Sequence, residues 1–157
     1  MELSGTYHYR QSHYSYHSTR SYLSNLSTAY INPQTSAGAL RNVINDPTSF
    51  TDTSSTALIA SVTFRLAVLK EDNSTYISNA NTAYDFVRRN IDGDGWLRNT
   101  ADPLTFYAPS SSSEPSPEGQ SFVLLLEAAQ RDFQDWVESD ATLPSGAMVI
   151  NDWILTN

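Results

Sequence analysis

Cysteine is absent from this chain of 157 residues. Its absence excludes thiol nucleophiles, cysteine-ligated zinc sites and scaffolds held by disulfides. A chain of this length is typical of one ordinary domain, and such a domain buries about 68–70% of the surface that its unfolded chain exposes. We therefore expect a hydrophobic core that needs no covalent cross-link for stability.

Positive charge is also scarce. Lys70 is the only lysine, and nine basic residues stand against 17 acidic ones, which gives a net charge of -8. The scattered arginines provide no electropositive surface for a phosphate backbone or an anionic membrane. No apolar run approaches the ~20 residues that span a bilayer. We expect no nucleic-acid partner and no membrane association, and no motif indicates a cofactor.

Hydroxyl groups are abundant instead, since serine and threonine together make up 37 residues. A composition that is rich in hydroxyls, acidic and poor in lysine favours an extracellular location. Residues 1–18 are polar and aromatic, however, and lack the charged and then apolar pattern of a signal sequence. The extracellular location is therefore an expectation from composition alone.

The first 37 residues form a head rich in tyrosine, serine and histidine, with few aliphatic residues. We expect this head to be weakly ordered, because it has little with which to build a core. A short amphipathic helix between residues 20 and 30 is consistent with the helical spacing of Tyr22, Leu23, Leu26 and Tyr30. Residues 38–157 are predicted to form a helical-hairpin domain, although the 141–157 tail fits either a strand remnant or a docked segment.

The predicted helices alternate in character. Residues 54–69 are apolar nearly all round, which indicates an inner helix covered on most sides. Residues 74–90 carry a single apolar stripe and therefore form an outer, half-exposed helix. A third, largely buried helix begins at Ser116, a serine N-cap followed by a proline in the first helical position. This alternation predicts stacked helical hairpins.

Two motifs resemble parts of metal-binding sites. His13 and His17 have the spacing that turns two ligands to one face of a helix, but no third ligand other than Glu2 lies nearby. Residues 92–96 resemble the start of a calcium loop, but no carboxylate follows at the twelfth position. We expect no metal site, and interpret residues 92–96 as a tight turn that ends the second helix and positions Trp96.

The starts of the two inner helices carry polar groups. The hydroxyls of residues 53–56 are interpreted as helix caps or, alternatively, as groups that face the hollow end of a helical barrel and bind a sugar or a loop. Glu118 lies in the first turn of the third helix, where the helix dipole favours a carboxylate. Gly119 beside it costs about 1 kcal/mol relative to alanine, so we expect a close approach of another backbone or a ligand there.

Several of these segments together resemble the carboxy-terminal part of the six-hairpin glycosidases. The similarity is greatest to fungal relatives of the unsaturated rhamnogalacturonyl and glucuronyl hydrolases, and it covers roughly residues 38–137. It is carried by residues 38–47, Phe50, residues 52–58, the 92–97 turn and residues 116–122.

The resemblance implies an all-α fold in which helical hairpins form part of an (α/α)6 toroid. It also implies an activity that removes an unsaturated uronic acid from oligosaccharides, with an aspartate as general acid and base. That aspartate belongs to the family's amino-terminal half and has no identifiable counterpart here, so the catalytic residues stay unknown. Twelve helices need on the order of 200 residues, so we expect a truncated or partial form of the toroid. The chain would be a natural truncation, a fragment of a longer gene product, or a small protein in which the tyrosine-rich head replaces the other hairpins.

The first functional hypothesis is a glycoside hydrolase-like protein that acts on or binds oligosaccharides. Trp96 and Phe106 would stack on a pyranose face, and Glu118 would accept hydrogen bonds from sugar hydroxyls. Ser54 and Ser55 would lie near the same cleft. The alternative is a non-catalytic helical interaction protein that forms a homodimer or binds a partner chain through helix faces left uncovered.

Overall fold

The computed structural model describes residues 35–70, 76–111 and 114–141. The 1–34 part of the predicted head, which contains the three histidines and the amphipathic segment, lies outside these residues. Residues 142–157 of the tail lie outside them too. The described residues contain three helices, α2 (Thr53–Lys70), α3 (Ile77–Arg89) and α4 (Pro117–Ala141). These agree with the helices predicted from the sequence.

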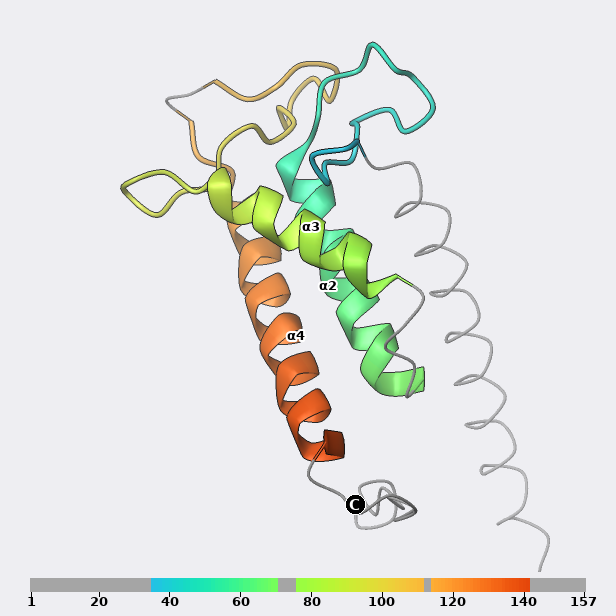
Figure 1. Cartoon of the computed structure of the whole chain (residues 1–157). Coiled ribbons are helices and arrows are strands. Elements are labelled where there is room, and N and C mark those ends of the chain that lie inside the picture. Colours follow the sequence, from blue (N-terminus) through green and yellow to red (C-terminus); the bar gives the residue numbers. More distant parts are fainter. Residues whose placement is uncertain (1–34, 71–75, 112–113, 142–157) are drawn as a thin grey trace, which may run out of the picture.

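The helices α2 and α4 run side by side in the same direction, and α3 returns across them (Figure 1). Both α2 and α4 therefore begin at the same end of the molecule, where the long loops also gather. No strand forms in the described ranges, where isolated β-bridges close the loops between Arg41 and Thr51, Ile91 and Leu97, and Ala101 and Pro109. The described part is thus all-α, and no helix in it is both long and apolar enough to cross a membrane.

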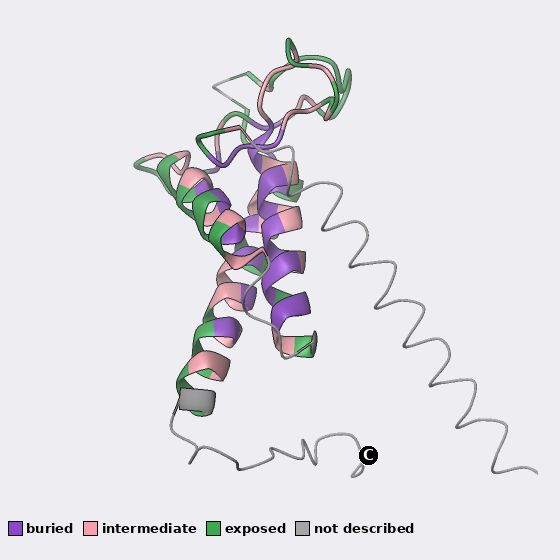
Figure 2. Ribbon diagram, turned by 45° about the vertical axis from the view of Figure 1, so that its right-hand side comes forward, coloured by how far each residue is buried: buried purple, intermediate pink, exposed green. Residues whose placement is uncertain are grey.

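The core lies between the three helices, whose facing sides are buried (Figure 2). It is built around Phe64 of α2, which is completely buried. Its ring packs against Phe133 of α4 and meets Tyr84 of α3 edge-on, with ring centroids 5.5 and 6.5 Å away. Small side chains let the helices approach closely around it. The buried residues of this core are Ala57, Ala60, Phe64, Ala67, Ala80, Ala83, Val87, Leu97, Val123, Leu126, Ala129 and Phe133.

Polar contacts join the helices at the edges of the core. The hydroxyl of Tyr84 donates to Glu127 Oε2 at 2.8 Å, and Arg88 Nη1 donates to the same hydroxyl at 3.1 Å. Burial, followed by the hydrogen bond to Glu127, raises the pKa of Tyr84 above its usual value. On the other side, Arg65 of α2 pairs with Asp132 of α4. These contacts fix α3 and α2 along α4.

The outer helix α3 buries one stripe, as predicted, and exposes Asp85, Arg88 and Arg89.

The helix α4 differs from the prediction of a largely buried helix, because Leu124 is 68% exposed and Leu125 is 49% exposed. Leu124 lies about 150° around the helix from the centre of the stripe of Val123, Leu126 and Phe133. Within the described residues, α4 is therefore covered on one side only.

Candidate functional site

The start of α2 is organised by the buried carboxylate of Asp52. Its oxygens accept hydrogen bonds from the backbone amides of Ser54 at 3.0 Å, Ser55 at 3.1 Å and Ala101 at 3.1 Å. The first two contacts cap the helix, since they satisfy amides that have no partner within it. The third ties the loop after Thr100 to the same point. Asp52 is therefore a structural hub with its acceptor capacity largely used.

The hydroxyls that follow Asp52 all donate hydrogen bonds within the protein. Ser54 Oγ donates to Asp52 Oδ1 at 2.7 Å, and Ser55 Oγ donates to the Asp52 carbonyl at 3.2 Å. Thr53 Oγ1 donates to the Arg98 carbonyl at 2.7 Å, and Thr56 Oγ1 donates to the Asp52 carbonyl at 2.6 Å. Each of these four hydroxyl groups therefore donates its proton either within the helix cap or to the neighbouring loop.

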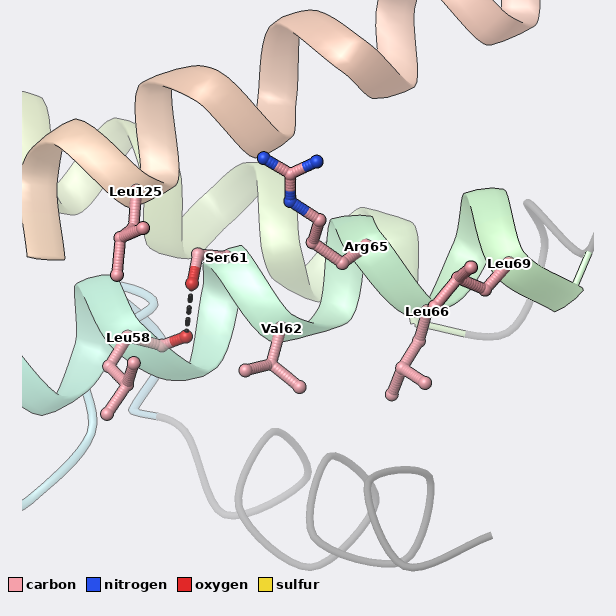
Figure 3. A pocket seen from close by; sticks show the side chains of 7 residues that line it. All are labelled: Leu58, Ser61, Val62, Arg65, Leu66, Leu69 and Leu125. Atoms are coloured by element: carbon pink, nitrogen blue, oxygen red, sulfur yellow. Dashed lines mark hydrogen bonds between the residues drawn. The ribbon is translucent and has the colours of Figure 1, made fainter. Parts of the chain in front are cut away.

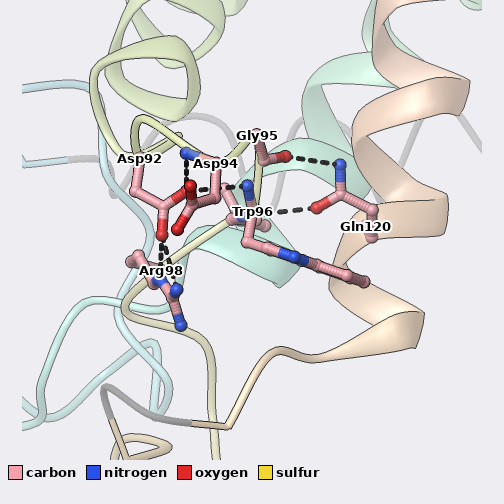
Figure 4. A network of polar contacts seen from close by, with 7 residues as sticks. Asp92, Asp94, Gly95, Trp96, Arg98 and Gln120 are labelled. Atoms are coloured by element: carbon pink, nitrogen blue, oxygen red, sulfur yellow. Dashed lines mark hydrogen bonds and ion pairs between the residues drawn. The ribbon is translucent and has the colours of Figure 1, made fainter.

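The turn between α3 and α4 holds Trp96 through its neighbours (Figure 4). Asp92 Oδ1 accepts from the amides of Asp94 at 3.0 Å and Trp96 at 2.9 Å, and Asp92 Oδ2 pairs with Arg98. The backbone bond from Trp96 and the Arg98 guanidinium hold the pKa of Asp92 below its ordinary value. Gly95 adopts a φ of 88°, a left-handed conformation that a glycine takes without steric cost. The indole of Trp96 stays partly exposed, at 38%.

A residue that sequence reasoning did not assign to the site, Gln120, fastens this turn to α4. Its Nε2 donates to the Gly95 carbonyl at 3.0 Å, and its Oε1 accepts from the Leu97 amide at 3.0 Å. The two bonds flank Trp96 along the chain, as Figure 4 shows. The sequence contained one signal for this role of Gln120: it is a polar residue in the first turn of a helix that was predicted to be largely buried.

The start of α4 packs as tightly as Gly119 suggested. A Cβ atom at this position would lie 2.9 Å from Thr100 Cγ2 and 3.3 Å from Leu97 Cδ2. Ser116 is the N-cap, and its Oγ accepts from the Gly119 amide at 3.0 Å. Glu118 is exposed, and its Oε2 lies 3.4 Å from Ser116 Oγ. The carboxylate of Glu118 is thus available to solvent beside the packed turn.

Phe106 lies on a separate loop, which the bridge between Ala101 and Pro109 closes. Its φ is 61°, a conformation that is costly for a bulky side chain, and its side chain is 64% exposed. Its carbonyl accepts a hydrogen bond of 2.8 Å from Asn42 Nδ2, which joins this loop to the one before α2. Strained backbone of this kind often marks functional loops.

The loops between the helices gather at the end of the molecule where α2 and α4 begin (Figure 1). All five predicted site residues belong to these loops and helix starts. Ser54 and Ser55 open α2, Glu118 opens α4, and Trp96 and Phe106 lie on the loops between them. A polar pocket of about 170 Å³ also lies at this end. It is lined by Leu97, Arg98, Asn99, Thr100, Ser110, Ser111 and Glu114. Typical pockets for small molecules begin near 300 Å³, so this one fits only part of a sugar residue.

Three of the carboxylates at this end have surroundings that do not suit a hydrolytic pair. Asp52 is enclosed by donors, Asp92 is paired with Arg98, and Glu118 points to solvent beside its own cap. Glycoside hydrolysis generally uses two carboxyl groups on opposite sides of the scissile bond. Among the described residues, no group of three or more histidine, aspartate or glutamate side chains could hold a metal ion. This geometry is suited to binding.

No protein-family model matches the chain, and no curated protein matches it either. Its fold is similar to two crystal structures described as possible members of the GH105 family. The protein from Salmonella enterica subsp. enterica serovar Paratyphi A gives a TM-score of 0.56 at 21% identity over 70% of this chain. The protein from Klebsiella pneumoniae subsp. pneumoniae gives a TM-score of 0.60 at 22% identity over 72% of this chain. The chain covers only 30% and 32% of these two structures.

At this identity the likeness concerns the fold. The predicted all-α fold of helical hairpins forming part of a helical toroid is confirmed. The parallel direction of α2 and α4, with α3 returning outside them, is the arrangement that inner and outer helices of such a toroid require. The predicted resemblance to six-hairpin glycosidases is supported at this level.

Proposed function

We propose that the loop end of this domain binds oligosaccharides, as part of a glycoside hydrolase-like protein. The observation that carries the proposal is the half-exposed indole of Trp96 on a turn held by Asp92 and Gln120. A large aromatic face that is fixed before binding loses little conformational entropy when a sugar stacks on it. In this proposal the exposed carboxylate of Glu118, which shares the first turn of α4 with Gln120, belongs to the same binding surface.

The other predicted residues contribute acceptors and apolar surface. Ser54 and Ser55 use their protons within the cap, but each hydroxyl oxygen retains lone pairs that a sugar hydroxyl can reach. Phe106 adds a second exposed aromatic ring on the neighbouring loop. The pocket near Thr100 would accept a single substituent of the sugar.

The substrate class in this proposal is oligosaccharides that contain an unsaturated uronic acid. It rests on the resemblance to the unsaturated rhamnogalacturonyl and glucuronyl hydrolases and is consistent with the two GH105-like structures. The finer relation to fungal members has no support from these structures, both of which are bacterial. An extracellular location remains part of the proposal on composition alone.

The proposal is tested by titration calorimetry of the full chain with an unsaturated uronic acid-terminated oligosaccharide and with its saturated counterpart. The unsaturated ligand should bind, and Trp96→Ala should weaken its binding by about tenfold or more, which corresponds to roughly 1.4 kcal/mol of lost stacking. Gln120→Leu should also weaken binding, because it frees the turn while leaving the indole in place.

The matched controls are Trp136→Phe, which changes a tryptophan far along α4 from the loop end, and Gln134→Leu, which changes an exposed glutamine of the same helix. Both should bind as the original chain does. Equal binding by Trp96→Ala and the original chain would refute the proposal, and so would an absence of heat with both sugars. Preference for the saturated sugar would refute the substrate class but keep the binding surface.

The second hypothesis, an interaction protein, is favoured by one observation. Leu124 is 68% exposed on the face of α4 that turns away from the core. Exposed apolar surface of this kind is typical of contacts with another chain. Light scattering after size-exclusion chromatography tests it: a dimer that Leu124→Ser converts to a monomer would support it, and a monomer at all concentrations would contradict the homodimer.

A further inference from the structure

The helix α2 carries two apolar faces, and only one of them packs in the core. Ala57, Ala60, Phe64 and Ala67 form the core face. At 100° per residue, the centre of a second stripe formed by Leu58, Val62, Leu66 and Leu69 lies about 180° around the helix from it. A helix with apolar residues on opposite sides needs covering on both.

This second stripe borders a hollow of about 270 Å³ (Figure 3). Its lining residues are Leu58, Ser61, Val62, Arg65, Leu66, Leu69 and Leu125. The polar members are already engaged, because Ser61 Oγ donates to the Leu58 carbonyl at 2.7 Å and Arg65 pairs with Asp132. The hollow therefore offers an apolar occupant mainly hydrocarbon surface, and its two polar members each have a partner.

One member of the stripe gives a further indication. Leu66 is only 6% exposed, although it does not belong to the core that α2, α3 and α4 share. Leu69, one turn further, is 46% exposed. Leu58 and Val62 are half-buried, so within the stripe Leu66 is the buried member and Leu69 the exposed one. Burial of Leu66 outside the shared core indicates that an apolar segment covers this part of the groove.

The course of the chain points to its own amino-terminal part as this partner. The Leu40 amide donates to Thr56 Oγ1 at 3.0 Å, so the chain reaches α2 at its first turn, next to Leu58. The described chain thus begins near one end of the groove, at Thr35, whose amide donates to the Ala39 carbonyl at 2.9 Å. Among the residues before Thr35, Tyr22, Leu23, Leu26 and Tyr30 have the spacing of one apolar helix face.

We propose that residues 21–31 form an amphipathic helix that lies antiparallel to α2 in the groove lined by Leu58, Val62, Leu66 and Leu125. From Tyr22 to Tyr30 such a helix rises about 12 Å, which equals the rise of α2 from Leu58 to Leu66. With Tyr30 at Leu58, the register places Leu26 at Val62 and Tyr22 at Leu66.

The absence of cysteine makes a direct test available in the full chain. The double variant Leu26→Cys with Val62→Cys should form an intramolecular disulfide under mild oxidation, because the proposed register brings the two Cβ atoms within bonding range. Non-reducing electrophoresis and the mass of the linked tryptic peptides identify the product. The matched control is Ser24→Cys with Val62→Cys, because Ser24 lies about 200° around the helix from Leu26.

The expected result is a monomeric cross-link that forms at least about tenfold faster in the Leu26 pair than in the Ser24 pair. A cross-linked dimer in the Leu26 pair would overturn the proposal and make a second copy of the chain the occupant. Equal rates in both pairs would overturn it as well, because a segment outside the groove presents no preferred face.

A second measurement avoids reliance on one pair of cysteines. Urea unfolding of Leu26→Ala, Val62→Ala and the double alanine variant gives the coupling between the two side chains. Direct contact predicts that the double variant loses clearly less stability than the sum of the single variants, whereas additive losses would contradict the contact. Leu26→Ala with Leu124→Ala serves as the additive control, since Leu124 lies outside the groove.

Discussion

Asp92 shows how one side chain sets the position of another. Its carboxylate accepts hydrogen bonds from the backbone amides of Asp94 and Trp96 and forms an ion pair with Arg98, so the turn closes around it. Sequence reasoning identified the turn and its role in placing Trp96 from the glycines and aspartates alone. It did not identify Arg98 as the ion-pair partner of Asp92, because this contact depends on how the chain continues after the turn.

Asp92→Asn should lower the stability of the domain at neutral pH, because the amide keeps an acceptor but loses the charge that Arg98 needs. The pKa of Asp92 is below its ordinary value of 3.8 in the folded chain. The stability it contributes is therefore present above about pH 4 and is lost as the pH falls through the lowered value. Melting temperatures at pH 7, 5 and 3 should differ most between variant and original at pH 7 and 5, and converge towards pH 3.

The exposed Asp135→Asn on α4 is the control for this experiment and should melt as the original chain does at each pH. A loss of stability in Asp92→Asn that stays constant down to pH 3 would show that the charge plays no part.

At the level of elements, the start of α4 depends on a close contact between a helix and a loop. Gly119 lets α4 approach Thr100 and Leu97, while Ser116 caps the helix and Gln120 fastens the Trp96 turn. Serine, proline and glycine in this order indicated the helix start from the sequence. The clamp by Gln120 required knowing which loop lies beside this turn, which no local pattern encodes.

Gly119→Ala distinguishes helix propensity from packing. In an open helix the change would stabilise by up to about 1 kcal/mol. Here the new Cβ would meet Thr100 Cγ2 at 2.9 Å and Ser116 Oγ at 3.2 Å, so we expect a loss of about 1–3 kcal/mol by urea unfolding, and a larger loss for Gly119→Val.

Gly93→Ala is the matched control for this substitution, because its added Cβ would have no neighbour within 4 Å. It should leave the urea midpoint nearly unchanged. An increase in stability for Gly119→Ala would contradict the close packing at the start of α4.

At the level of the whole molecule, stability depends on the aromatic contact at the centre of the three helices. Phe64 is fully buried between Tyr84 and Phe133, each from a different helix. The periodicity of each helix predicted that it buries an apolar face. It could not show that α4 leaves Leu124 exposed, because exposure depends on which other helices are present.

Phe64→Ala should cost about 3–5 kcal/mol, because it removes the ring and leaves a cavity that the neighbouring helices fill only in part. The urea midpoint, followed by circular dichroism, measures this loss. Phe106→Ala removes an aromatic ring of the same size that is 64% exposed, and should change stability by no more than about 0.5 kcal/mol. Similar midpoints for the two variants would place the core elsewhere.

The amino-acid sequence alone determined the helices, their alternation between inner and outer, the caps at their starts and the close approach at Gly119. These features follow from interactions between residues a few positions apart, which periodicity and capping chemistry record. Only the tertiary structure decided that Asp52 holds the loop at Ala101 and that Gln120 holds the turn of Trp96. Such contacts join residues 23 or more positions apart, and their geometry exists only after the helices have packed.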